Sequence, residues 1–318
     1  MMHVVVMGTG GLGGFYGARL AIAGHKVSYI ARGQQLQALK ANGLILRGSQ
    51  EETRLFPVAA SDNPADLEPA DYILFCVKLY DVETAAQLIK PIITPRTSVI
   101  SVLNGINGPE RIATTLQHDR VFGGAALVSA RIEAPGEIRY MDRPAGYSLI
   151  MGHHDSSMNK HLDGFVHLAS TAHFEARVSE NIDVTLWDKL AQLATLAGLT
   201  ALGRMPIGAA LDFVELENVA RAMLAEVKAL ANAKNIAIDD DIIDKKIALY
   251  KTFPRDLYAS MYHDWNNGKR MEVEDIFGYI VRESQKHGLP SPVMEMVYAY
   301  LKPWAKGADA LHQAVAHQ

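Results

Sequence analysis

The chain has 318 residues, of which 49% are apolar and 21% are charged, and this composition excludes a disordered protein. The length fits about two domains. With 31 Lys and Arg against 35 Asp and Glu, the formal charge of −4 argues against a nucleic-acid-binding protein with a broadly basic surface. The charge is unevenly spread, because residues 1–50 hold five basic residues and no acidic one, whereas the remaining 268 hold 26 basic and 35 acidic residues.

Short apolar strands alternate with helices in the N-terminal part of the chain. Strands are expected at residues 3–7, 26–30, 71–77 and 97–103, and helices at 12–23, 81–90 and 109–117. This alternation predicts an α/β fold with a doubly wound parallel sheet of the Rossmann type. Segments rich in β-forming residues between 121 and 151 are expected to extend the same sheet.

After about residue 180 the strand pattern gives way to helices alone. They are expected at residues 181–202, 211–234, 241–251, 258–266, 272–287 and 292–304. The change predicts two domains, residues 1–179 with the Rossmann sheet and residues 180–318 all helical.

Three features bear on the location of the protein. The only cysteine, Cys76, lies in an apolar run, where we expect a buried structural thiol, and no intramolecular disulfide is possible. The N-terminal apolar stretch is short and ends in glycines, unlike a signal peptide. No apolar segment approaches the ~20 residues needed to cross a bilayer. We expect a cytoplasmic protein with no membrane partner.

A glycine motif follows the first strand and opens the first helix. Its sequence, Gly8-Thr9-Gly10-Gly11-Leu12-Gly13, matches the dinucleotide-binding pattern G-x-G-x-x-G in the required strand–loop–helix context. Gly8 permits the tight turn, Gly10 lets the backbone approach a pyrophosphate, and Gly13 lets the helix pack on the strand. The helix N-terminus supplies N–H groups for the phosphates. These residues predict a dinucleotide site.

The end of the second strand indicates which dinucleotide is bound. Enzymes that use NAD place an acidic residue there for the ribose 2′-hydroxyl, but this strand ends Tyr29-Ile30-Ala31-Arg32-Gly33 with no acid near it in sequence. The guanidinium of Arg32 can pair with a 2′-phosphate. We therefore predict NADP(H) as cofactor, with a solvated surface arginine as the alternative.

Three further polar residues are candidates for the chemistry. Lys78 and Asn104 follow the third and fourth strands, where side chains face the ligand crevice of such sheets. Lys189 lies among the apolar residues that open the helical domain. Desolvation there would lower the pKa of its ammonium group towards the range that is useful for a general acid. Each residue taken alone also fits an ordinary surface or turn position.

The order and spacing of these motifs resemble the ketopantoate reductase (2-dehydropantoate 2-reductase) family of NADPH-dependent oxidoreductases over most of the chain. Two later motifs belong to the resemblance, Ser260-Met261-x-x-Asp264 and Gly268-x-Arg270-x-Glu272-Val273-Glu274. The resemblance implies reduction of ketopantoate to pantoate, a step of pantothenate and coenzyme A synthesis. It makes residues 1–179 the NADP-binding domain and residues 180–318 the substrate and catalytic domain.

The resemblance also implies roles for single residues. Lys189 would donate the proton to the substrate carbonyl oxygen, where hydride attack builds negative charge. Catalysis would rest on Lys189, Glu272 and Asn104, with Glu272 contacting both the cofactor and the substrate hydroxyl. Lys78, Asn104 and the backbone of Ala130 would contact the cofactor, and Ser260 and Asp264 would hold the substrate.

The substrate side departs from the family pattern. Leu193, Ala197 and Ile207 stand where the family usually carries asparagines, which predicts a less polar pocket that Gln192 and Thr200 compensate only in part. Two alternatives to ketopantoate reduction therefore stay open. One is a reductase of another branched or bulkier 2-oxo acid or ketone. The other is a non-enzymatic NADP-binding redox sensor, against which Lys189 and Glu272 argue.

Other patterns predict few additional partners. The 12 histidines include no helical metal-binding spacing, so we expect no metal, and His153-His154 is expected to be a solvated pair. The expected partner is a small 2-oxo acid, without nucleic acid. The sequence leaves the oligomeric state open, and the apolar helical domain is compatible with a homodimer.

Overall fold

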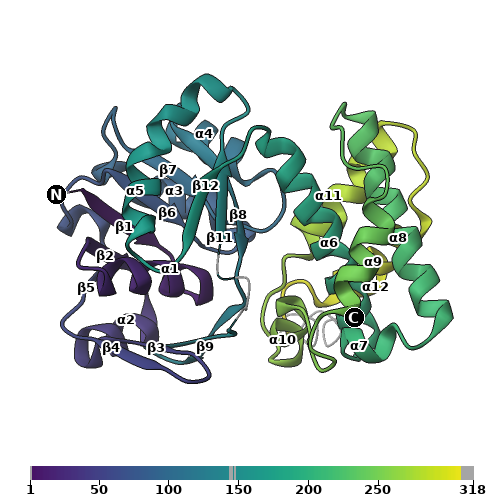
Figure 1. The fold of residues 1–318 in the computed structure, drawn as a ribbon, viewed down its shortest axis with the longest axis horizontal. Coiled ribbons are helices and arrows are strands. Elements are labelled where there is room, and N and C mark those ends of the chain that lie inside the picture. Colours follow the sequence, from purple (N-terminus) through teal and green to yellow (C-terminus); the bar gives the residue numbers. More distant parts are fainter. Residues whose placement is uncertain (1, 143–145, 147, 309–318) are drawn as a thin grey trace, which may run out of the picture. The chain divides into compact units, whose positions relative to one another are not determined.

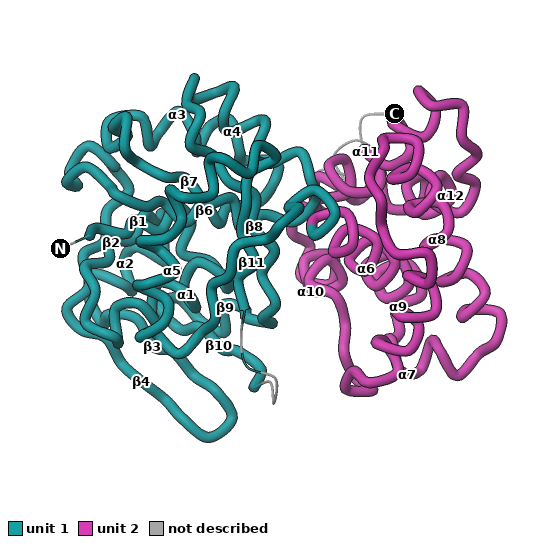
Figure 2. The backbone as a smooth tube through the Cα atoms, turned by 45° about the horizontal axis from the view of Figure 1, so that its top comes forward, with its two compact units in different colours: residues 1–185 teal, residues 186–318 magenta. Residues whose placement is uncertain are grey.

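The computed structural model describes residues 2–142, 146 and 148–308. The chain divides into two compact units, residues 1–185 (unit 1) and residues 186–318 (unit 2), shown in two colours in Figure 2. Unit 1 contains a mostly parallel sheet with helices, and the described part of unit 2 is helical. The predicted fold class, a Rossmann-type α/β domain followed by a helical region, is confirmed.

The main sheet of unit 1 has eight strands in the order β12-β11-β8-β7-β6-β1-β2-β5. All neighbouring pairs are parallel except β11 with β8. From β1 the chain goes to β2 on one side and later to β6 on the other, so the strand order reverses between β1 and β6. The strands are β1 (His3–Met7), β2 (Lys26–Ile30), β5 (Ala59–Ser61), β6 (Tyr72–Phe75), β7 (Ser98–Ser101), β8 (Val121–Leu127), β11 (Ser148–Gly152) and β12 (Glu175–Val178).

The central strands form because they are short apolar runs buried on both faces, as parallel strands between helices are. Figure 1 shows helices on both sides of this sheet. The helices of unit 1 are α1 (Gly11–Ile22), α2 (Gly33–Asn42), α3 (Val82–Ile89), α4 (Gly108–Leu116) and α5 (Asp163–Ser170). Short 3-10 turns flank them at Pro64–Asp66, Leu79–Asp81, Lys90–Ile92 and Ser156–Leu162.

A second sheet was not expected from the sequence. Its order is β4-β3-β10-β9, formed by β3 (Leu44–Arg47), β4 (Glu52–Leu55), β9 (Ala130–Ala134) and β10 (Glu137–Tyr140). The expectation that residues 121–151 extend the main sheet is therefore correct for β8 and β11 and wrong for β9 and β10. The hairpin joins β3 instead, through the parallel pairing of β10 with β3, and Ile138 of β10 packs directly on α1: a Cβ on Gly14 would lie 2.5 Å from Ile138.

Unit 2 contains the expected series of helices. They are α6 (Ile182–Gly203), which begins in the last residues of unit 1, α7 (Ile207–Ala210), α8 (Val214–Ala233), α9 (Ile242–Lys251), α10 (Ser260–Asn266), α11 (Val273–Lys286) and α12 (Pro292–Leu301), with a 3-10 turn at Lys302–Trp304. The helix expected from residue 211 begins at Val214 instead, because the extended backbone of Phe213 separates it from α7.

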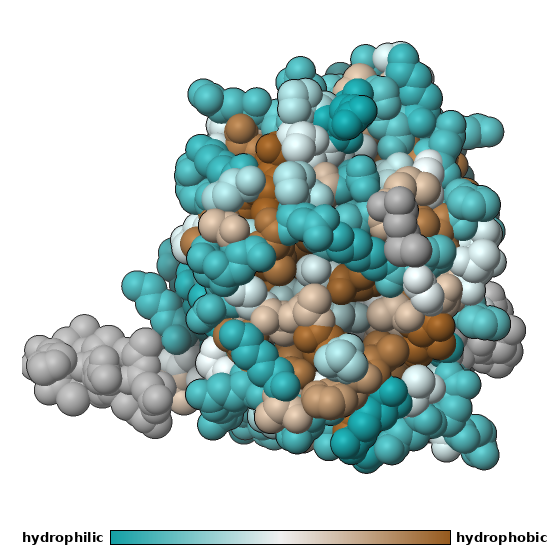
Figure 3. All heavy atoms as spheres, turned by 90° about the vertical axis from the view of Figure 1, so that its left-hand side faces the viewer, coloured by the Kyte–Doolittle hydropathy of each residue, from teal (hydrophilic) through white to brown (hydrophobic). Residues whose placement is uncertain are grey.

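The surface and core of the described residues have ordinary features. On the face seen in Figure 3, hydrophobic residues gather in patches separated by hydrophilic ones.

Cys76, expected to be buried, is half-buried after β6 and packs against the core of unit 1. Within the described ranges, no helix is both long and apolar enough to span a membrane.

Candidate active site

The glycine loop lies between the ends of β2 and β6. The N–H groups of Gly8 and Thr9 donate to the Ile30 carbonyl at 3.2 and 3.3 Å. Gly8 has φ +93°, and a Cβ there would lie 3.0 Å from the Cys76 carbonyl oxygen. A Cβ on Gly13 would lie 2.2 Å from the Gly8 carbonyl oxygen. Both positions require glycine because the backbone passes too close for a side chain.

Gly10 is different, since no atom lies within 4 Å of the place its Cβ would occupy. It caps the N-terminus of α1 in an extended conformation and leaves open space beside the first turn of that helix. A helix N-terminus with accessible backbone N–H groups suits a phosphate. The loop therefore fits the pyrophosphate of a dinucleotide.

The second sheet braces this loop from the side. A Cβ on Gly11 would lie 2.2 Å from the carbonyl oxygen of Ala130, the first residue of β9. The Gln35 amide donates to the Thr9 carbonyl at 3.0 Å and accepts from the Gly136 N–H at 2.9 Å. The structure thus places Ala130 beside the glycine loop. Sequence reasoning missed Gln35, because a single amide in a polar helix carries no recognisable signal.

Lys78 and Asn104 lie at the carboxyl ends of neighbouring strands. Lys78 is half-buried after β6 and caps the turn Leu79–Asp81, and Asn104 is half-buried after β7, before Gly105 with φ +75°. Because β1, β6 and β7 are adjacent and parallel, their carboxyl ends lie side by side, and the glycine loop, Lys78 and Asn104 all follow this carboxyl edge of the sheet. This edge, at the reversal of strand order, is where α/β sheets of this kind bind ligands.

Arg32 follows β2 with an 82% exposed side chain, and its Nη2 lies 2.7 Å from Oδ2 of Asp81. No acidic residue is close to the end of the second strand in the sequence, as expected. The expectation is nevertheless wrong for the folded chain, because Asp81 lies beside Arg32 there. Asp81 comes from the turn after β6, and only one strand, β1, separates β6 from β2. Its position three residues after Lys78 was the available signal.

Lys189 lies in α6. The residue is half-buried, and its Nζ is shielded from solvent. Leu193 and Ala197 follow at one and two helical turns, so the three residues share one face of α6. Leu193 is half-buried and Ala197 is buried, and Ile207 is buried at the start of α7. Apolar groups thus occupy all three positions at which asparagine was expected.

Two polar side chains expected near that face, those of Thr200 and Gln192, form hydrogen bonds within unit 2. The Thr200 hydroxyl donates to the Leu196 carbonyl at 2.8 Å and accepts from the Ala259 N–H at 3.2 Å. The Gln192 side-chain oxygen accepts from Lys246 Nζ at 3.3 Å. Both groups therefore hold α6 to neighbouring segments.

The remaining candidates lie on α10 and at the start of α11. Ser260 is exposed as the first residue of α10, and Asp264 is half-buried one turn later. Glu272 caps α11 and is 4% exposed. The link from Thr200 to Ala259 connects α6, which carries Lys189, to the residue before Ser260.

Two tyrosines flank Ser260 in sequence. The rings of Tyr258 and Tyr262 stack with centroids 3.9 Å apart and an interplanar angle of 18°. Desolvation, and after it the interaction with Tyr262, raises the pKa of the Tyr258 phenol above its ordinary value. A stacked pair of phenol rings therefore comes from the two residues that lie two positions before and two positions after Ser260.

We expect Thr200→Val to destabilise the protein. Valine keeps the shape but leaves the buried Ala259 N–H without its acceptor, at a cost of about 1–3 kcal/mol. Urea unfolding would measure the loss, with Thr200→Ser as control because serine keeps the hydroxyl and loses only a methyl group, worth about 1 kcal/mol. Equal stability of the valine variant and the wild type would contradict this role.

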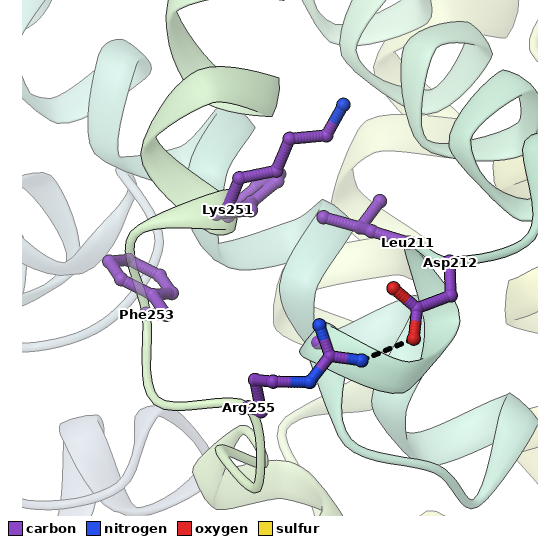
Figure 4. Close-up of a pocket in the computed structure, with 7 residues that line it drawn as sticks. Leu211, Asp212, Lys251, Phe253 and Arg255 are labelled. Atoms are coloured by element: carbon purple, nitrogen blue, oxygen red, sulfur yellow. Dashed lines mark hydrogen bonds and ion pairs between the residues drawn. The ribbon is translucent and has the colours of Figure 1, made fainter.

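A pocket of about 220 Å³ elsewhere in unit 2 contains none of these residues (Figure 4). It is lined by Gly208, Leu211, Asp212, Tyr250, Lys251, Phe253 and Arg255. Its charged groups are already paired, Arg255 with Asp212 and Lys251 with Glu217. Across residues 2–142, 146 and 148–308 no group of three or more His, Cys, Asp or Glu could hold a metal ion.

Comparison with known proteins gives the family. The family model "Ketopantoate reductase PanE/ApbA" matches residues 4–155, and its C-terminal counterpart matches residues 181–305. The 2-dehydropantoate 2-reductase of Archaeoglobus fulgidus is 29% identical over 293 residues, which cover 92% of this chain and 94% of the relative.

Solved structures agree with this result. A PanE/ApbA family ketopantoate reductase from Ralstonia eutropha matches with a TM-score of 0.86 and 29% identity, over 96% of this chain and 98% of that one. A D-mandelate dehydrogenase with NADH and anilino(oxo)acetate matches with a TM-score of 0.88 over 98% and 100% of the two chains, but its 21% identity shows the fold alone. The chain therefore belongs to the ketopantoate reductase PanE/ApbA family of oxidoreductases.

Proposed function

We propose that the protein is an NADPH-dependent reductase that converts ketopantoate to pantoate, a step of pantothenate and coenzyme A synthesis. The observation that carries the proposal is that the glycine loop, with open space beside Gly10, and the residues Lys78 and Asn104 all follow the carboxyl ends of the adjacent parallel strands β1, β6 and β7. Relatives at 29% identity with the same family architecture support the substrate class.

Each group has a defined task in this proposal. Backbone N–H groups near Gly10 bind the pyrophosphate, and Arg32 pairs with the 2′-phosphate. When bound, the nicotinamide supplies the hydride for the ketone carbon. Lys189 stabilises the negative charge that develops on the carbonyl oxygen and then donates its proton there. Glu272 accepts a hydrogen bond from a substrate hydroxyl.

The two parts of the chain divide these tasks. We assign cofactor binding to residues 1–179, which include the glycine loop, Lys78, Asn104 and the backbone of Ala130. We assign the substrate and the proton transfer to residues 180–318, in which Ser260 and Asp264 hold the substrate.

A second candidate is the reduction of a bulkier, less polar 2-oxo acid. It is favoured by Leu193, Ala197 and Ile207, and by the hydroxyl of Thr200, which is used within unit 2. The stacked rings of Tyr258 and Tyr262, which flank Ser260 in the sequence, would also accept an apolar substrate group.

An NADPH-oxidation assay with ketopantoate, 2-oxoisovalerate and benzoylformate distinguishes the candidates. We expect turnover of ketopantoate with the highest kcat/KM. A higher kcat/KM for benzoylformate than for ketopantoate would assign the substrate to the bulkier class of 2-oxo acids. Binding of NADPH without turnover of any 2-oxo acid would contradict the reductase proposal and favour the redox sensor.

A further inference from the structure

The contact between Arg32 and Asp81 joins two groups with opposite consequences for cofactor choice. In Rossmann domains an arginine near the end of the second strand accommodates the 2′-phosphate of NADP, whereas an acidic residue there accepts a hydrogen bond from the ribose 2′-hydroxyl of NAD. This chain has both groups at that place, with Nη2 of Arg32 2.7 Å from Oδ2 of Asp81. The acid is supplied by a different strand end from the usual one.

We propose that Asp81 is a specificity-determining residue that lowers the preference for NADPH and lets the protein also bind NADH. The inference rests on the proposed cofactor site at the carboxyl edge of β1 and β6. With NADH, the Asp81 carboxylate accepts a hydrogen bond from the ribose 2′-hydroxyl. With NADPH, the same carboxylate opposes the 2′-phosphate that Arg32 attracts.

The position of Asp81 is fixed by its own turn. Its N–H donates to the Lys78 carbonyl at 2.9 Å, and Arg111 of α4 donates to the Leu79 carbonyl at 2.9 Å. Arg111 also binds Glu83 through two contacts of 2.7 and 2.9 Å. These contacts hold the backbone of the turn from which the Asp81 carboxylate reaches Arg32.

The side-chain geometry favours a role in ligand selection over a role in helix capping. Asp81 precedes α3, where an aspartate often caps the helix, yet its side chain makes no capping hydrogen bond. It points to Arg32 instead and is 28% exposed, whereas the Arg32 side chain is 82% exposed. The contact uses one guanidinium nitrogen, so Arg32 retains donors for a phosphate.

The test compares binding of 2′,5′-ADP and 5′-ADP by calorimetry, together with KM for NADPH and NADH. We expect Asp81→Asn to tighten 2′,5′-ADP about tenfold, because one of two like charges is removed. Binding of 5′-ADP and NADH should weaken, because the ribose 2′-hydroxyl loses the carboxylate that accepts its hydrogen bond, and Asp81→Ala should shift the ratio in the same direction. An unchanged ratio, or weaker binding of 2′,5′-ADP, would overturn the proposal, the latter because Asp81 would then merely position Arg32.

Two controls separate this inference from the proposed function. Asp119→Asn removes the same charge from an exposed residue before β8, at the opposite edge of the sheet, and should leave the ratio unchanged. Arg32→Ala should weaken 2′,5′-ADP and leave 5′-ADP unchanged. If Arg32→Ala has no effect while Asp81→Asn shifts the ratio, the assignment of Arg32 to the 2′-phosphate fails and the role of Asp81 stands. Because the ADP fragments are measured without turnover, an inactive wild type would not affect this result.

Discussion

Replacing Lys189 by alanine is expected to lower kcat by about 10²- to 10⁴-fold, the range for loss of a positioned proton donor. The side chain lies half-buried on α6 with its Nζ shielded from solvent, so bulk water cannot readily take its place. Affinity for NADPH should be unchanged, because the groups assigned to the phosphates belong to unit 1. Steady-state kinetics and NADPH fluorescence would measure the two effects separately.

The controls for this experiment come from the same unit. Lys245→Ala removes an exposed lysine that forms ion pairs with Asp239 and Asp241, and it should leave kcat unchanged. Lys189→Arg keeps the positive charge but holds its proton too tightly to donate it, so it should be nearly as defective as the alanine variant. If the alanine variant kept more than a tenth of the wild-type kcat, Lys189 would lose its assigned role.

Two glycines of the same loop should respond in opposite ways to alanine. Gly13→Ala places a Cβ 2.2 Å from the Gly8 carbonyl oxygen and 2.8 Å from a methyl of Val6. Since the obstacle includes backbone, α1 must shift, and we expect a loss of about 3 kcal/mol in the free energy of unfolding. Urea unfolding would measure it.

Gly10→Ala is the matched variant, because it meets no atom within 4 Å and its backbone has φ −86°. Its stability should equal that of the wild type, while its affinity for NADPH should fall at least about tenfold, since a methyl group would lie where the pyrophosphate approaches. Normal affinity in Gly10→Ala would show that no phosphate approaches this loop.

The parts of the fold that could be predicted from the sequence depend on local patterns. The strand at Tyr72–Phe75 is a continuous apolar run, and α6 is long and apolar, so both were expected within a few residues. The second sheet could not be predicted, because its strands are short and partly exposed. Its pairing also joins Ile45 to Glu137, and no local pattern encodes such a distant contact.

The same limit applies to the site. The glycine motif and Lys78 could be placed at one sheet edge, because the carboxyl ends of parallel strands meet there. The acid beside Arg32 could not, since Asp81 is separated from it by 49 positions and is brought close only by the strand order. The inward hydrogen bonds of Thr200 were likewise hidden, because a sequence does not show which way a threonine on a helix turns.

The bracing of the glycine loop by the second sheet has a consequence for the order in which the protein assembles. Gly11 rests against Ala130, and Gln35 links Thr9 to Gly136. Two of these supports, Ala130 and Gly136, lie more than 100 positions downstream of the loop. Contacts so far apart in sequence form late, because closing a long loop costs chain entropy. A nascent chain that ends before residue 130 therefore carries the whole glycine motif but lacks the bracing that holds it in place.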